Sequence, residues 1–191
     1  MADRSDADEG QRESLPPWAA EDHACEDCRL SYRDIPVQRA IEVIRSLPPM
    51  AGDAVAAVPA QPRRRRPSAG AWSVTEYVCH LRDVYATYTI RLHRVRTEDR
   101  PALEPMFNEL RASRFRYNEH DVNAVLAELA ATAAGFCDEA DCTRPDQWDR
   151  VATRLPGEER TARWLARQAM HEGQHHLDDI RRTGQAVITG V

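Results

Sequence analysis

Apolar residues recur at helical spacing in four separate stretches of the chain. In the first stretch they fall on one helix face, at Val37, Ala40, Ile41, Ile44 and Leu47. Pro48 and Pro49 are expected to end or interrupt this helix, because proline lacks the amide hydrogen that a helix interior needs. The pattern therefore predicts an amphipathic helix that begins near residue 37.

The second stretch has the clearest start signal. Ser73 and Glu76 form a Ser-x-x-Glu capping box, and an apolar stripe follows at Val74, Tyr77, Val78, Leu81, Val84, Tyr85 and Tyr88. The third stretch covers about residues 121–140, and the fourth about residues 161–182, where Gly184 is a plausible stop. Residues 99–120 carry two prolines and little periodicity, so they predict a long crossover connection.

Four amphipathic helices joined by connections of uneven length predict an all-α fold, a four-helix bundle. We assign this bundle to residues 37–191. Residues 23–36 are expected to form a small N-terminal cap that contains a Cys-x-x-Cys motif. Residues 1–22 have almost no apolar content and predict a disordered tail.

Composition narrows the function classes. The net charge of −5 over 191 residues argues against a nucleic-acid-binding domain, which would usually be basic. No apolar run approaches the length of a membrane span, and the acidic N-terminus lacks the order of a signal peptide. Five cysteines without framework spacing suit reduced thiols, so we expect a cytoplasmic protein. Exposed bundle faces are compatible with a homodimer.

The stretch "AMHEGQHHLDDI", residues 169–180, holds the candidate chemistry. His171 and His175 are four residues apart, so both imidazoles can point at one spot, as in metal sites that take two ligands from one helix. His80 is the natural third ligand, because it lies beside the inward stripe of its helix. Three histidines would leave an open coordination position, which is typical of a catalytic site. Asp178 and Asp179 are placed to hold a ligand histidine through its second nitrogen.

Other interpretations of these residues stay open at this stage. A His-x-x-x-His pair on a charged helix is often only surface, and a lone inward histidine is often only hydrogen-bonded. Glu172 completes a formal match to the His-Glu-x-x-His pattern of metalloproteases, but no extended signature follows. Cys25 and Cys28 are compatible with incidental thiols of a cap, with half of a second metal site, or with a redox pair.

Two segments together resemble a known family. "WSVTEYVCHLRDV" and "LARQAMHEGQHHLDDI" are similar to the motifs of the DinB-like superfamily of metal-binding four-helix bundles, closest to its actinobacterial thiol-transferase branch. The resemblance covers roughly residues 37–184. It implies a divalent metal ion, zinc or nickel, held by His80, His171 and His175 with water in the open position.

The same resemblance implies an activity. Enzymes of that branch use a low-molecular-weight thiol, mycothiol, as the nucleophile, and a thiol that binds a divalent cation is deprotonated outright. We therefore expect a metal-dependent mycothiol S-transferase that acts on an electrophilic small molecule, in detoxification or antibiotic biosynthesis. No catalytic residue is expected beyond the metal centre. The residues expected to contact the thiol or the substrate are Arg160, Arg163, Trp164 and Tyr77.

Two other functions fit the same ligand set. A metallohydrolase would use the metal-bound water instead of a thiol. A non-catalytic metal-binding stress protein would retain the ion without turnover. Neither alternative is excluded by the sequence, and neither calls for a nucleic acid or a membrane as partner.

Overall fold

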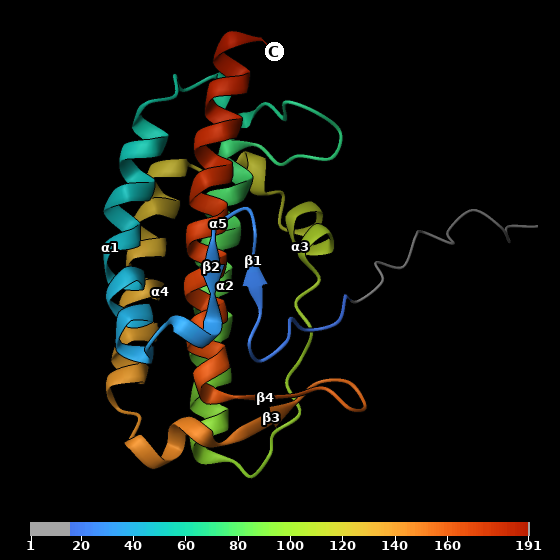
Figure 1. The fold of residues 1–191 in the computed structure, drawn as a ribbon. Coiled ribbons are helices and arrows are strands. Elements are labelled where there is room, and N and C mark those ends of the chain that lie inside the picture. Colours follow the sequence, from blue (N-terminus) through green and yellow to red (C-terminus); the bar gives the residue numbers. More distant parts are fainter. Residues whose placement is uncertain (1–15, 191) are drawn as a thin grey trace, which may run out of the picture.

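The computed structural model describes residues 16–190, and four long helices form its core (Figure 1). These helices are α1 (Val37–Ala56), α2 (Val74–Thr97), α4 (Val122–Asp141) and α5 (Ala162–Thr189). The predicted all-α four-helix bundle is therefore confirmed. The capping box at the start of α2 is also present, because the Ser73 side chain accepts a hydrogen bond from the Glu76 amide and the Glu76 carboxylate accepts one from the Ser73 amide.

The four helices are not arranged in the order in which the chain forms them. α1 packs against α4 and α5, and α2 packs against the same two helices. Consecutive helices α1 and α2 therefore lie on a diagonal of the bundle, as do α4 and α5. This arrangement brings α2 beside α5, the two helices that carry the candidate metal ligands.

Helix α1 does not end at its two prolines, so that expectation was wrong. The helix continues to Ala56 with Pro48 and Pro49 inside it. Ala51 and Val55 are fully buried and extend the apolar stripe of the first half of the helix. Burial of this second half offsets the helical hydrogen bonds that the prolines cannot make.

Gly184 does not end α5 either. The helix runs on to Thr189, and Gly190 with φ of 76° provides the left-handed cap. At Gly184 an added Cβ would lie 2.5 Å from Cγ2 of Val58. The glycine thus marks a close approach of the chain after α1, not a helix end.

Shorter elements occupy the connections. The predicted crossover contains the short helix α3 (Asn108–Arg114). Two antiparallel hairpins also form, β1 (Ala24–Cys25) with β2 (Leu30–Ser31), and β3 (Val151–Thr153) with β4 (Glu159–Thr161). Single 3-10 turns cover Tyr32–Asp34, Pro62–Arg64, Tyr117–Glu119 and Pro145–Asp149.

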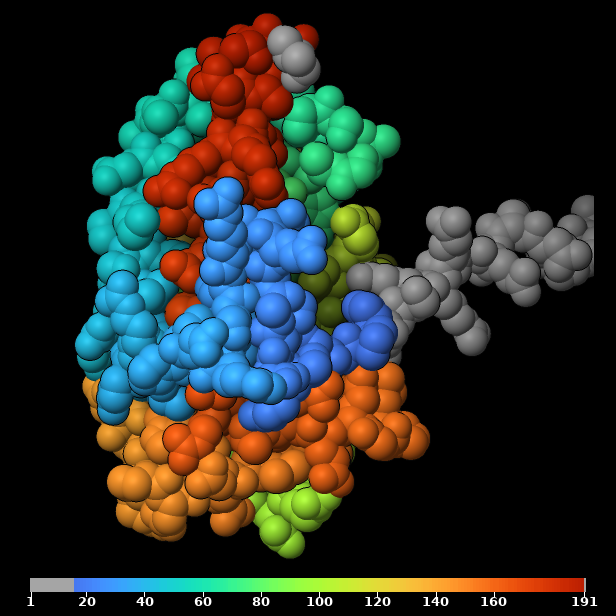
Figure 2. Space-filling model, in the orientation of Figure 1, coloured from blue at the N-terminus to red at the C-terminus, as the bar shows by residue number. Residues whose placement is uncertain are grey.

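The N-terminal segment lies across the middle of α5 (Figure 2). Trp18 is 9% exposed, and its ring centroid lies 5.3 Å from that of Trp164. The Arg154 guanidinium lies 4.9 Å from the centroid of the Trp18 ring. Of the expected disordered tail, residues 1–15 lie outside the described residues, whereas residues 16–22 are placed on the bundle. Within residues 16–190, no helix combines the length and the apolar character needed to cross a membrane.

A buried carboxylate ties α2 to the crossover. Asp83 accepts hydrogen bonds from Arg82, from Arg111 at 2.6 Å and from the Tyr117 hydroxyl. Burial raises the pKa of the Asp83 carboxyl, but these three donors outweigh it and hold that pKa below its usual value. The network fixes the crossover against the side of α2.

Candidate metal centre

Metal-binding side chains of the described residues gather in two clusters on neighbouring faces of α5. One holds His80, Glu172 and His176, and the other holds Cys25, Cys28, His171 and His175; within each, the donor atoms lie within 4.8 Å of one another. The structure therefore does not bring His80 together with His171 and His175. Consecutive helix residues differ by about 100°, so Glu172 and His176 face α2 while His171 and His175 face the N-terminal hairpin.

His80 is the buried member of the first cluster. The residue is 1% exposed, and its ring lies edge-on to Trp72 and His176, with centroids 5.0 and 4.7 Å away. Burial lowers the pKa of His80, so the imidazole is neutral. Neither ring nitrogen makes a hydrogen bond within the described residues, although Oε2 of Glu172 lies 3.5 Å from Nε2. A buried polar group without a hydrogen bond destabilises a protein by about 1–3 kcal/mol, and a metal ion bound to the ring nitrogen would remove this cost.

Glu172 directs one carboxylate oxygen at both histidines. Its Oε1 accepts a hydrogen bond from the Gln168 amide at 2.8 Å. Its Oε2 lies 3.5 Å from Nε2 of His80 and 3.3 Å from Nε2 of His176. Burial raises the pKa of Glu172, but the two histidines lower it well below its usual value. The carboxylate is therefore ionised and held in place.

His176 lies between two carboxylates. Its Nδ1 is 2.8 Å from Oδ2 of Asp179, and its Nε2 faces Glu172. Burial lowers the pKa of His176, but Asp179 and Glu172 raise it to about 9. The position thus favours a cation, either a proton on the ring or a divalent ion next to it.

The two aspartates expected to support the ligands differ in their surroundings. Asp179 contacts His176 and lies 3.8 Å from Nε2 of His175, so it faces both clusters. Asp178 is exposed and pairs with Arg181 at 3.0 Å. Of the two aspartates, Asp179 is therefore the one placed to orient a ligand histidine.

The first cluster fits a catalytic zinc-type site. Two imidazoles and one carboxylate are a known catalytic donor set, with the fourth position left for water or substrate. The donor atoms of His80, Glu172 and His176 converge on one point. Glu172 is ionised, and the buried His80 ring makes no hydrogen bond within the described residues. The residues present therefore fit a divalent ion.

A small cavity adjoins this cluster. Its volume is about 160 Å³, and its walls are Pro16, Pro17, Trp18, Ala19, His80, Val84, Tyr88, Arg91, Met106, Asn108, Arg154, Trp164, Gln168 and Glu172. Arg91 donates a hydrogen bond to the Glu104 carbonyl at 2.6 Å, but its Nε is buried without a partner. Oδ1 of Asn108 is buried and unpaired as well. The cavity thus offers one cationic donor and one amide to a ligand.

Only part of the expected contact set lines this cavity. Trp164 does, packed against Trp18. Tyr77 is not a lining residue and lies beside the His176 ring, with centroids 5.4 Å apart. Arg160 donates to the carbonyls of residues 18 and 19, and Arg163 pairs with an aspartate at 2.7 Å. Both arginines are therefore engaged within the protein.

Sequence reasoning missed Glu172, His176, Gln168 and Arg91 as site residues. A signal for the first two was present, because Glu172 and His176 have the same four-residue spacing as the predicted histidine pair. No pattern in the sequence indicates that Arg91 lines a cavity with its Nε unpaired.

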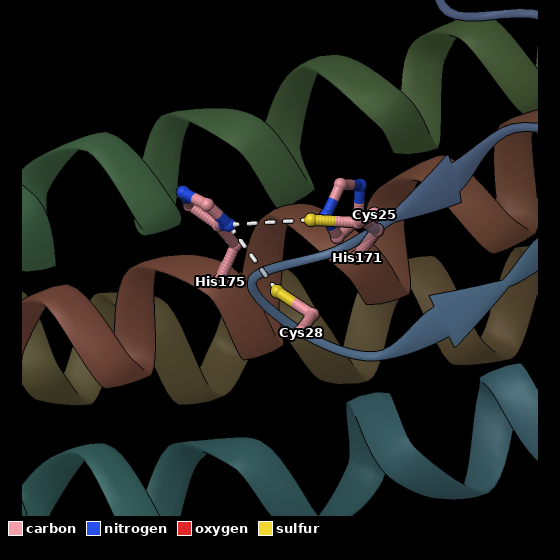
Figure 3. A group of neighbouring side chains, drawn as sticks. All are labelled: Cys25, Cys28, His171 and His175. Atoms are coloured by element: carbon pink, nitrogen blue, oxygen red, sulfur yellow. Dashed lines mark hydrogen bonds between the residues drawn. The ribbon is translucent and has the colours of Figure 1, made fainter.

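The second cluster joins the N-terminal hairpin to α5 (Figure 3). Cys25 and Cys28 approach Nδ1 of His175, at 4.0 and 3.2 Å from their sulfur atoms. Burial, with the neighbouring Cys25, raises the pKa of the Cys28 thiol to about 12. Burial also lowers the pKa of His171 to about 4. Both cysteines are free thiols.

Comparison with known proteins gives a family and a shared fold. The model of the DinB superfamily matches residues 50–180. YfiT from Bacillus subtilis, described as a probable metal-dependent hydrolase with an unusual four-helix bundle topology, is 19% identical with a TM-score of 0.73, over 88% of this chain and 93% of that one. A mycothiol-dependent maleylpyruvate isomerase is 14% identical with a TM-score of 0.63, over 78% of this chain and 62% of that one. No curated protein matches by sequence.

Proposed function

Because the chain belongs to the DinB superfamily, we propose that it is a metal-dependent enzyme whose ion is held by His80, Glu172 and His176. The observation that carries this proposal is the convergence of Glu172 Oε2 on Nε2 of both histidines, at 3.5 and 3.3 Å. Imidazole and carboxylate suit zinc and also nickel. Of the triad expected from the sequence, His80 keeps its role here.

We further propose that the enzyme transfers a low-molecular-weight thiol, such as mycothiol, to an electrophilic small molecule. A divalent ion in this site would lower the pKa of a thiol from about 8.5, so that thiolate forms at neutral pH. The fold shared with a mycothiol-dependent isomerase supports the choice of thiol. The electrophile would enter from the adjoining cavity.

The surrounding residues would prepare the site for this chemistry. Gln168 orients Glu172, and Asp179 orients His176 through its Nδ1. Trp18 and Trp164 form part of the cavity wall. The unpaired Nε of Arg91 would bind an anionic group of the thiol or the electrophile.

The size of the cavity limits what it can hold. At about 160 Å³ it is smaller than the roughly 300–1,000 Å³ typical of small-molecule sites. It therefore accommodates only the reacting ends of a thiol and an electrophile, unless residues 16–19 move aside. Most of a bulky thiol would remain outside this wall.

The test is calorimetric titration of the zinc-loaded protein with mycothiol. We expect micromolar binding that is lost in His80→Ala. His93→Ala is the matched control, because His93 lies on the same helix but is exposed and away from the cluster; it should bind as the wild type does. Absence of binding in the wild type would refute the thiol-transferase proposal.

A second function has a specific observation in its favour. YfiT, which has the higher TM-score, is described as a probable metal-dependent hydrolase. Turnover of an ester, amide or lactone without added thiol, lost in His80→Ala, would identify this chain as a metallohydrolase. Retention of the ion with no turnover of any kind would instead favour a metal-binding stress protein.

A further inference from the structure

The four side chains of the second cluster come from segments that are far apart in the chain. Cys25 ends β1 and Cys28 lies in the turn of residues 26–29, so one hairpin loop presents both sulfur atoms to α5 (Figure 3). His171 and His175 are one helical turn apart on the facing side of α5. Together they have the Cys-x-x-Cys and His-x-x-x-His spacings of structural zinc sites.

The distances agree with one shared ion. With metal–sulfur bonds of about 2.3 Å and metal–nitrogen bonds of about 2.0–2.1 Å, the donors of a tetrahedral site stand roughly 3.3–3.8 Å apart. Cys28 and Cys25 lie 3.2 and 4.0 Å from Nδ1 of His175, and all four donors lie within 4.8 Å of one another. Small side-chain adjustments would complete the tetrahedron.

Hydrogen bonding leaves a nitrogen of His171 free for an ion. The Tyr32 hydroxyl donates to Oε1 of Gln168 at 2.6 Å, so its oxygen accepts from Nδ1 of His171 at 3.0 Å. Nδ1 of His171 therefore carries the hydrogen, and Nε2 has an available lone pair. That Nε2 is buried and has no partner among the described residues. An unpaired buried acceptor of this kind requires an explanation.

His175 is oriented in a matching way. Its Nδ1 faces the two sulfur atoms, while its Nε2 faces the Asp179 carboxylate at 3.8 Å. Metal-bound histidines commonly have a carboxylate on the side of the other ring nitrogen. Each histidine of the cluster thus has one nitrogen supported by the protein and the other available to an ion.

We propose that Cys25, Cys28, His171 and His175 form a second metal site, for zinc or a similar thiolate-binding divalent ion. Four protein donors leave no open position, so the role of this site is structural. Its ion would fasten the N-terminal hairpin to α5. Residues 16–19, just before the hairpin, form one wall of the cavity at the first centre. The second ion would thereby hold that wall in place without taking part in the reaction.

Cobalt substitution in the full chain tests this assignment. We expect the reduced wild type to bind two equivalents of Co²⁺ and to show a thiolate-to-cobalt charge-transfer band in the near ultraviolet. The double variant Cys25→Ser/Cys28→Ser should lose one equivalent and the band. His80→Ala should lose the other equivalent and keep the band. Cys142→Ser is the matched control, because Cys142 is an exposed free thiol outside the cluster, and it should behave as the wild type does.

A second measurement needs no variant. Zn²⁺ should protect Cys25 and Cys28 of the wild type from alkylation, while Cys142 stays reactive. A reduced wild type without the charge-transfer band, or without protection, would overturn the proposal. So would a Cys25–Cys28 disulfide that persists with excess Zn²⁺ and mild reductant. The two centres share no ligand, so failure of this site and failure of the proposed function are separate results.

Discussion

Gly173 of α5 packs tightly against α1 and α2, and we expect its substitution by alanine to destabilise the bundle. An added Cβ would lie 2.2 Å from Oη of Tyr85 and 2.6 Å from Cδ1 of Leu47. Both neighbours are fully buried, so neither can rotate away into solvent. Alanine itself favours a helix over glycine by about 1 kcal/mol, whereas overpacking of a well-packed core costs about 1–3 kcal/mol.

Because both contacts are far shorter than a real Cβ allows, the cost should lie at the upper end of that range. The expected net loss in the free energy of unfolding is about 1–2 kcal/mol, or roughly 2–8 °C in Tm for a chain of this size. Gly135→Ala in α4 is the matched control, since a Cβ there meets nothing within 4 Å. It should gain about 0.5–1 kcal/mol.

Urea denaturation followed by circular dichroism would measure both variants, with thermal melts as a check. The reasoning requires opposite signs for the two substitutions. If Gly173→Ala were as stable as the wild type, the close packing of α5 on Tyr85 and Leu47 would be refuted.

Three further predictions concern the carboxylate network, the N-terminal segment and the metal centre. Asp83→Asn should lower the free energy of unfolding by about 2–3 kcal/mol. The pKa of Asp83 in the folded protein lies below its unfolded value of about 3.9, so the stabilisation by this carboxylate is present above about pH 3.9 and is lost as the pH falls through the folded pKa. The free energy of unfolding of the variant should therefore fall less steeply with decreasing pH than that of the wild type. Trp18→Ala should speed backbone hydrogen exchange in residues 16–36 while the Tm of the bundle changes by less than roughly 2 °C; equal exchange in both proteins would contradict the packing on Trp164. Asp179→Asn should weaken metal binding by about 10–100-fold, and unchanged affinity in a competition titration would show that this carboxylate does not support the ligands.

The bundle could be predicted from the sequence because its helices carry strong local signals. The capping box at Ser73 and the stripe that follows it fix α2 without reference to the rest of the chain. The errors arose where tertiary packing overrides a local rule. Two prolines remain inside α1 because its second half is buried. Gly184 lies inside α5 because Val58 packs too closely against it to leave room for a side chain.

The site was predictable in its helices but not in its ligand set. His80 does belong to one cluster of metal-binding side chains, and His171 and His175 belong to the other. Spacing alone could not decide which of two overlapping pairs on α5 faces α2, because His171 with His175 and Glu172 with His176 are equally spaced. The rotation of α5 about its axis depends on the packing of the whole bundle. The approach of Cys25 and Cys28 depends on a hairpin that no local pattern predicted.

The one-residue offset between the pair His171 and His175 and the pair Glu172 and His176 has a consequence for sequence conservation among related chains. The donors on the α2 side and those on the hairpin side are separate sets, although they alternate along the same six residues. Relatives that have lost the Cys-x-x-Cys hairpin should therefore also vary freely at positions 171 and 175, yet keep His80, Glu172 and His176. Alignments of such chains would then show positions 172 and 176 fixed and positions 171 and 175 variable, interleaved within one helical turn and a half.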